Sequence, residues 1–321
     1  MKKITLGIFI LLSFTINSFA LAQVSATITL EPKNPNPKSV VTLSFESYSF
    51  DVNTAMISWT VDGKKVLQGD GEKKLQLKTG EIGDTISVTV TASTLDGYEV
   101  SQSITISPAS VILIYEAPQS YVPLLYEGRS LPGEGALVKV TALPLLGSEG
   151  KVISPSKLSY TWYINDTVFK NASGLGKQST FMRLDYLENK NTVKVVVRSP
   201  YGNTAEKTIS IYAHDVMPLV YTYNTIFGAD FTKIVERRFE AVKDFTLSLQ
   251  PFYVSDEDKK PASFVWYLDG LPATPLGGRL LELHPKEDSY GSKILSLDVY
   301  GSDRRLQKAQ TKVEILFDTR K

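Results

Sequence analysis

The chain has 321 residues, of which 42% are hydrophobic and 21% charged, so it is long and apolar enough to build roughly two or three globular domains. The formal net charge is +1, which leaves no basic excess to attract nucleic acid or an acidic lipid surface. There is no cysteine, which excludes disulfides, thiolate ligands of zinc and a thiol nucleophile.

The first 22 residues have the pattern of a secretory signal peptide. Lys2 and Lys3 form a positive start, an apolar stretch runs from Ile4 to Ile16, and Ala20-Leu21-Ala22 has the small-residue pattern of a cleavage site. We therefore expect an exported protein, either periplasmic or at the cell surface. The alternative is an uncleaved anchor, but the apolar stretch is short for a span and no second one follows, so we expect no membrane span in the mature chain.

Three short phrases with a central tryptophan follow at intervals of about 100 residues, which is the size of one immunoglobulin-like sandwich. In each phrase apolar residues alternate with others, so that the indole and its apolar neighbours share one face of a strand. Each phrase ends in Asp-Gly or Asn-Asp, which indicates a tight turn. The phrases are Ile57–Gly63, Tyr160–Asp166 and Phe264–Gly270, and we expect their tryptophans, Trp59, Trp162 and Trp266, to lie in three separate cores.

Further alternating segments stand at matching distances from each tryptophan. The segments before it are Val40–Phe45, Leu137–Leu143 and Phe245–Leu249. Those after it are Ile86–Ala92 and Ser103–Ser107, Val193–Val197 and Thr208–Tyr212, and Leu295–Val299 and Thr311–Phe317. Short strands at regular spacing with turn residues between them predict an all-β fold of three tandem β-sandwiches. The predicted domains are a signal peptide over 1–22 and sandwiches over 23–108, 109–213 and 214–321.

The order Trp-x-apolar-Asp-Gly, followed by a valine-rich strand and a hairpin containing glycine, resembles the immunoglobulin-like and PKD-type domains of exported bacterial proteins. The resemblance is strongest in the first repeat, where Pro35-Asn36-Pro37 precedes Val40-Val41-Thr42-Leu43 and the order Trp59-Thr60-Val61-Asp62-Gly63 follows. The chain lacks the Phe-Gly-Asp-Gly run of PKD domains and the cysteine pair of antibody domains. The resemblance implies a structural or adhesive protein that binds another protein at the cell envelope, such as a pilus or other surface assembly.

Residues with catalytic chemistry are sparse. The two histidines, His214 and His284, stand at unrelated places in their repeats, and no P-loop, G-x-S-x-G or H-E-x-x-H motif is present. We therefore expect no enzyme, no cofactor and no metal. The acidic run Asp256-Glu257-Asp258 is interpreted either as a solvated loop or as a calcium loop, and a calcium requirement stays open.

Tyrosine usage is the remaining functional hint, since the chain has 16 of them and tyrosine is favoured at contacts. Tyr163 and Tyr267 fall on the outward face of the tryptophan strands, and Tyr121 and Tyr126 lie in a long segment. We expect a partner-binding face at these four residues, for a protein or a glycan, with packing against a neighbouring domain or ordinary half-buried strand packing as the alternative. The segments 109–136 and 214–240 are expected to be extended connections against the preceding domain. The alternative function places a carbohydrate-binding, glycan-hydrolysing or peptide-hydrolysing site there, because loops often carry function.

Overall fold

The computed structural model describes residues 25–124, 126–185, 190–241, 243–274 and 278–319. The expected signal peptide over 1–22 lies outside these residues. The all-β expectation is confirmed, since the described ranges contain strands and two short 3-10 turns but no α-helix. The described residues form two compact units, one made of 25–33, 40–77 and 86–106 and the other of the remainder.

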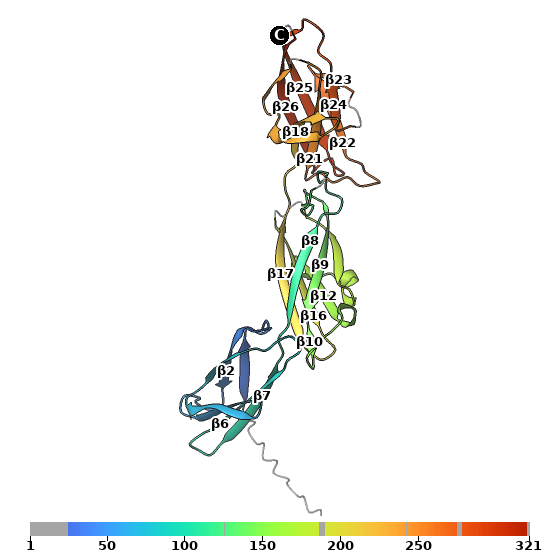
Figure 1. Ribbon diagram of the computed structural model, residues 1–321. Helices are drawn as coiled ribbons and strands as arrows, with labels where there is room; N and C mark the ends of the chain where they lie inside the picture. Colours follow the sequence, from blue (N-terminus) through green and yellow to red (C-terminus); the bar gives the residue numbers. More distant parts are fainter. Residues whose placement is uncertain (1–24, 125, 186–189, 242, 275–277, 320–321) are drawn as a thin grey trace, which may run out of the picture. The chain divides into compact units, whose positions relative to one another are not determined.

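The first sandwich pairs a three-stranded sheet of order β1-β2-β5 with a four-stranded sheet of order β4-β3-β6-β7. Strand β2 of the first sheet and strands β6 and β7 of the second are labelled in Figure 1. β1 and β2 are antiparallel, and so are all neighbours in the four-stranded sheet. This three-against-four arrangement is typical of immunoglobulin-like sandwiches. Leu43 and Phe45 of β2 contact the same core as Trp59 of β3, and all three side chains are fully buried. The strands are β1 Ala26–Glu31, β2 Val40–Ser47, β3 Met56–Val61, β4 Lys64–Asp70, β5 Lys74–Lys78, β6 Ile86–Ser93 and β7 Glu99–Ile106.

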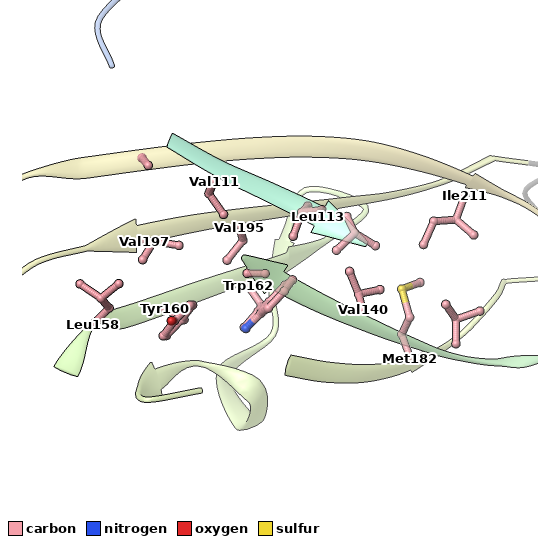
Figure 2. Packing of buried hydrophobic residues seen from close by; sticks show 14 of the residues in the cluster. Val111, Leu113, Val140, Leu158, Tyr160, Trp162, Met182, Val195, Val197 and Ile211 are labelled. Atoms are coloured by element: carbon pink, nitrogen blue, oxygen red, sulfur yellow. The ribbon is translucent and has the colours of Figure 1, made fainter. Parts of the chain in front are cut away.

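The second sandwich has sheets of order β15-β9-β8 and β13-β12-β16-β17, with β14 also paired to β12. In Figure 2 the indole of Trp162 lies among side chains from both sheets, including Leu113 and Val140 of one and Val195 of the other. This sandwich also contains a short hairpin, β10-β11, and two 3-10 turns, η1 and η2. The elements are β8 Ser110–Glu116, β9 Leu137–Leu145, β10 Gly147–Ser148, β11 Lys151–Val152, η1 Pro155–Lys157, β12 Ser159–Ile164, β13 Thr167–Val168, η2 Lys170–Ala172, β14 Gly174–Leu175, β15 Ser179–Arg183, β16 Lys190–Arg198 and β17 Thr204–Tyr212.

The third sandwich has sheets of order β19-β18-β21-β24 and β20-β26-β25-β22-β23. The short edge strand β20 runs parallel to β26, whereas the other neighbours are antiparallel. Its core is built around Trp266, which is fully buried with Leu247 and Leu249 of the opposite sheet. The strands are β18 Met217–Asn224, β19 Gly228–Ile234, β20 Arg238–Ala241, β21 Phe245–Phe252, β22 Ser263–Leu268, β23 Leu271–Ala273, β24 Leu280–Leu283, β25 Tyr290–Tyr300 and β26 Lys308–Asp318.

A hydrogen bond from the indole N–H recurs in all three sandwiches. Trp59 donates to the carbonyl of Glu72 at 2.7 Å, Trp162 to that of Lys177 at 2.9 Å, and Trp266 to that of Gly278 at 3.2 Å. Each acceptor stands two residues before the first residue of a strand in the opposite sheet, namely β5, β15 and β24. The buried indole therefore fixes the point where the chain crosses from one sheet to the other, and its polar atom is satisfied in doing so.

The turn after each tryptophan strand is also the same. Asp62, Asn165 and Asp269 all have positive φ, between 46° and 47°, and the residues after them, Gly63, Asp166 and Gly270, are also left-handed. The side-chain oxygen of each first residue accepts a backbone N–H near the start of the next long strand, from Ser87 at 2.9 Å, Thr192 at 2.8 Å and Ile294 at 2.8 Å. Aspartate and asparagine tolerate this backbone and supply the acceptor, which explains why they recur here.

Candidate binding groove

The two segments that the sequence marks as long connections are partly strands. Segment 109–136 contributes β8 to the second sandwich and then forms a loop from Ala117 onward, while 214–240 contains β18, β19 and the start of β20. The loop after β8 contacts the following sandwich rather than the preceding domain, because the N–H of Tyr121 donates to the carbonyl of Val254 at 2.7 Å and Ser120 bridges to Ser255. The expected packing against the preceding domain was therefore wrong for the loop that begins at Ala117, whereas the N–H of Ala109, the first residue of the segment, donates to the carbonyl of Pro35 at 3.0 Å.

A chain of polar side chains begins at Tyr121 and continues along β21. The Tyr121 hydroxyl donates to Oε1 of Gln250, and Nε2 of Gln250 donates to Oγ of Ser248 at 2.9 Å. Ser248 and Gln250 alternate along β21 with the core residues Leu247 and Leu249, so they face away from the core although both are buried. Burial raises the pKa of the Tyr121 phenol, and the nearby Arg279 guanidinium acts in the opposite direction.

These polar residues lie in a groove of about 990 Å³, which we call the junction groove. Its floor includes Ser248 and Gln250, and its walls come from both marked segments: Tyr121, Val122 and Leu124 from the first, and Tyr223, Phe227 and Phe231 from the second. A smaller hollow of about 300 Å³ shares Leu124 and Phe231 with it and is completed by Pro123, Tyr126 and Phe252. Large concave sites of this kind are common where two domains meet.

The rim of the junction groove is apolar and unusually exposed. The exposed fractions are 87% for Leu124 and 85% for Phe227, and Phe231 is about half exposed while its ring packs edge-on against Tyr221 at 5.1 Å. Scattered exposed apolar residues are normal on a protein surface, but here several gather around one hollow. Such a gathering is typical of a surface that another molecule covers.

One cation and one carboxylate line the groove. The Arg279 guanidinium carbon lies 5.0 Å from the centroid of the Tyr121 ring, and Arg279 forms no ion pair with any described carboxylate. Asp256 Oδ1 accepts the N–H of Ala262 at 2.9 Å. The groove therefore presents a guanidinium, the residue type best suited to planar anionic groups, whose charge no described carboxylate neutralises by contact.

The second and third sandwiches are joined beside the groove by specific polar contacts. Gln307, which is 1% exposed, donates through Nε2 to the carbonyl of Glu134 at 2.7 Å and to Oγ of Ser255 at 3.0 Å, and its Oε1 accepts the N–H of Ser255 at 2.8 Å. Arg183 and Glu257 form a two-pronged ion pair with N···O distances of 2.8 and 3.0 Å. The Arg183 hydrogen bonds lower the pKa of the Glu257 carboxyl below its usual value.

Two residues of the acidic run Asp256-Glu257-Asp258 form contacts with other groups of the protein. Glu257 faces Arg183, and Asp256 accepts from a backbone N–H. Over the described ranges no group of three or more His, Asp or Glu side chains is arranged to hold a metal ion. His284, on the exposed surface, has Nδ1 2.9 Å from Asp244 Oδ2, which raises the pKa of its imidazole.

The four tyrosines singled out from the sequence divide into two pairs. Tyr121 and Tyr126 line the junction groove and its smaller hollow, and Tyr121 is also held in the junction by Gln250. Tyr163 lies on β12 with the Lys194 ammonium 5.9 Å from its ring centroid, and Tyr267 lies on β22; both are half-buried and neither lines the groove. A binding role for any of the four stays a prediction.

Sequence reasoning missed Arg279, Ser248 and Gln250. A signal for the last two was present, since Ser248 and Gln250 stand at the polar positions of an alternating strand and so mark its outer face. Nothing in the sequence around Arg279 distinguishes it from other surface arginines, because its role depends on a loop that is about 150 residues away in the chain.

The fold and the groove define a protein of tandem immunoglobulin-like β-sandwiches with a concave surface at one junction. No family model matches the chain, and no curated protein matches it in sequence. In the part of the chain that the structure describes, no helix has the length and apolar character to cross a membrane.

Several solved structures of tandem β-sandwich proteins are similar. The three N-terminal domains of the highly immunogenic outer capsid protein of bacteriophage RB49 are 14% identical, with 92% of this chain and 99% of that chain covered and a TM-score of 0.28. The central fibronectin-III array of RIM-binding protein is 10% identical over 92% and 97%, with a TM-score of 0.27. A bacterial ice-binding adhesin is 9% identical over 92% and 99%, with a TM-score of 0.23. At these TM-scores the similarity assigns no function.

Proposed function

We propose that the protein is an exported, non-catalytic structural or adhesive protein that uses its tandem sandwiches to bind another protein at the cell envelope, with a pilus or other surface assembly as the kind of partner. The domain boundaries of 23–108, 109–213 and 214–321 and the PKD-type resemblance are part of this proposal. The observation that supports it is the junction groove, whose rim carries exposed Leu124 and Phe227. Covering such side chains with a partner removes apolar surface from water, which favours association.

The alternative function, carbohydrate binding or hydrolysis of glycans or peptides, was placed in the segments that line this groove. Glycoside hydrolysis ordinarily needs two carboxyl groups about 5–10 Å apart. The lining of the groove includes one described carboxylate, Asp256, and it is already bonded to the N–H of Ala262. This composition favours binding over hydrolysis.

Capture of a binding partner tests the proposal. The full chain carrying a C-terminal tag is expressed in its host, the envelope fraction is crosslinked, and the captured proteins are compared with those captured by a tagged chain of unrelated fold. One reproducible envelope protein in excess over the control is expected. In parallel, the purified protein is assayed on panels of glycans and peptides, and turnover that disappears in Asp256→Asn would overturn the proposal.

A further inference from the structure

We propose that the junction groove is the docking site for a peptide segment of a partner protein, and that this segment carries apolar side chains on either side of an acidic residue. The inference rests on the proposed binding function and names the chemistry of what the groove binds. Three observations carry it: the apolar rim, the polar floor and the guanidinium of Arg279.

The rim selects for an apolar partner rather than a glycan. Leu124 and Phe227 are almost fully exposed, and the smaller hollow beside them is lined by Pro123, Tyr126 and Phe252. Burying these surfaces is favourable only against groups that do not lose hydrogen bonds to water in the process. A sugar hydroxyl buried against Leu124, Val122 or Pro123 would lose such bonds, whereas an apolar side chain of a peptide would not.

The floor supplies hydrogen bonds that suit a peptide backbone. Gln250 uses its Oε1 for Tyr121 and its Nε2 for Ser248, so all three side chains are held in place before a ligand arrives. The Ser248 hydroxyl accepts from Gln250 and donates to no described group, which leaves its proton for a ligand carbonyl. A pre-organised polar strip between apolar walls fixes the position of a ligand at little cost in entropy.

Arg279 determines the charge of the ligand. Its guanidinium lies against the Tyr121 ring, and it is the cation of the groove that lacks an ion pair with the described carboxylates. Asp256, the acidic residue of the lining, lies beyond ion-pair distance of it. A carboxylate between the two apolar side chains of the ligand would complete the pairing, and arginine and tyrosine are among the residue types that most often dominate binding.

Selection of peptides tests the inference. The purified protein, expressed from the full chain, is panned against a phage-displayed library of random linear peptides, with counter-selection on Arg279→Gln. The enriched peptides are expected to share apolar residues that flank Asp or Glu. A synthetic peptide of that sequence should lose at least tenfold in affinity for Arg279→Gln and for Phe227→Ser, measured by fluorescence anisotropy.

Two controls separate contact from loss of fold. Arg304→Gln changes a guanidinium that also lies over a tyrosine ring, Tyr300 at 5.8 Å, but outside the groove, and Leu95→Ser changes a residue that is 93% exposed. Both should leave the affinity unchanged. The peptide with its acid changed to the amide should bind the parent and Arg279→Gln equally well, which a merely structural role of Arg279 would not produce. In the unaltered protein, bound peptide should slow hydrogen exchange in 121–124 and 226–231.

Four results would overturn the inference: no enriched sequence, enriched peptides that lack an acid, peptides indifferent to Arg279→Gln, or slowed exchange elsewhere. If the protein binds a glycan from a panel and Arg279→Gln abolishes that binding, the ligand of the groove is a sugar and not a peptide. If the protein self-associates in sedimentation experiments and Phe227→Ser abolishes this, the groove binds a second copy of the chain. If the envelope partner is still captured by Phe227→Ser and Arg279→Gln, the proposed function stands and the groove is not its site.

Discussion

Replacing Trp162 with alanine tests the proposition that each sandwich is stabilised by its own buried indole. Trp162 is fully buried and its N–H is bonded to the carbonyl of Lys177 at 2.9 Å. The substitution removes the ring from the core and leaves a cavity, which costs about 3–5 kcal/mol. Since domains of this size have a stability of about 5–15 kcal/mol, the loss is a large part of the total.

The expected result is selective. A change of 1 kcal/mol shifts the unfolding midpoint of a domain of about 100 residues by about 4–8 °C, so the second sandwich should unfold at least about 12 °C earlier. Trp162→Phe keeps most of the apolar ring but loses the donor to Lys177, which costs about 1–3 kcal/mol from the unpaired carbonyl and should give an intermediate shift. Leu175→Ala, at a residue that is 71% exposed in the same sandwich, should change the stability by less than about 0.5 kcal/mol.

Scanning calorimetry gives the midpoints, and hydrogen exchange read by mass spectrometry assigns them to strands. The exchange of β12 and β16 should accelerate in Trp162→Ala, while that of β3 and β6 in the first sandwich stays unchanged. The reasoning is refuted if Trp162→Ala and Trp162→Phe unfold like the parent, or if β3 loses protection as much as β12.

Three further changes have expected outcomes. Asp166→Gly should raise the midpoint of the second sandwich by the equivalent of about 0.5–1 kcal/mol, because Asp166 has φ of 61° where the other repeats have glycine; an unchanged or lower midpoint contradicts this. Glu257→Gln should cost about 1 kcal/mol near pH 7, and because Arg183 lowers the folded pKa of Glu257, the difference from the parent should begin to shrink near the unfolded pKa of about 4.3 and disappear once the pH has fallen through the lower folded pKa; a constant difference down to pH 2 argues against it. His284→Gln should remove a fall in the third sandwich's midpoint as the pH rises above about 6.5, because Asp244 raises the folded pKa of His284 and the stabilisation is lost as the pH passes that value; a parent whose midpoint is flat there refutes it.

The tryptophan strands were predictable because their information is local. The alternation of apolar residues predicted that Ile57 and Trp59 share one face of a strand, and Asp62-Gly63 predicted the turn after it. What the pattern could not show is the partner of the indole N–H, because Glu72 and its counterparts stand in connections with no common motif. The choice of acceptor follows from how the two sheets pack, which is a property of the folded core.

The candidate groove was predictable in location but not in composition. The segments 109–136 and 214–240 stood out by length, and both contribute walls. Their meeting depends on contacts between residues more than a hundred positions apart, such as Tyr121 with Gln250, which no periodicity reveals. The parallel pairing of β20 with β26 was missed for the same reason, since four residues at an edge carry too little pattern to indicate a partner.

Two hydrogen bonds, one at the turn after the tryptophan strand and one from the indole N–H, recur in each sandwich. They make the strand, turn and crossover of one repeat exchangeable with those of another. Every repeat closes the same two hydrogen bonds, one at the Asx turn and one at the crossover, using residues from that repeat alone. A chimaera that carries the strand, turn and crossover of one repeat inside the frame of another would therefore retain both contacts. Laboratory recombination of this chain could vary the outward-facing side chains of a module without rebuilding its interior.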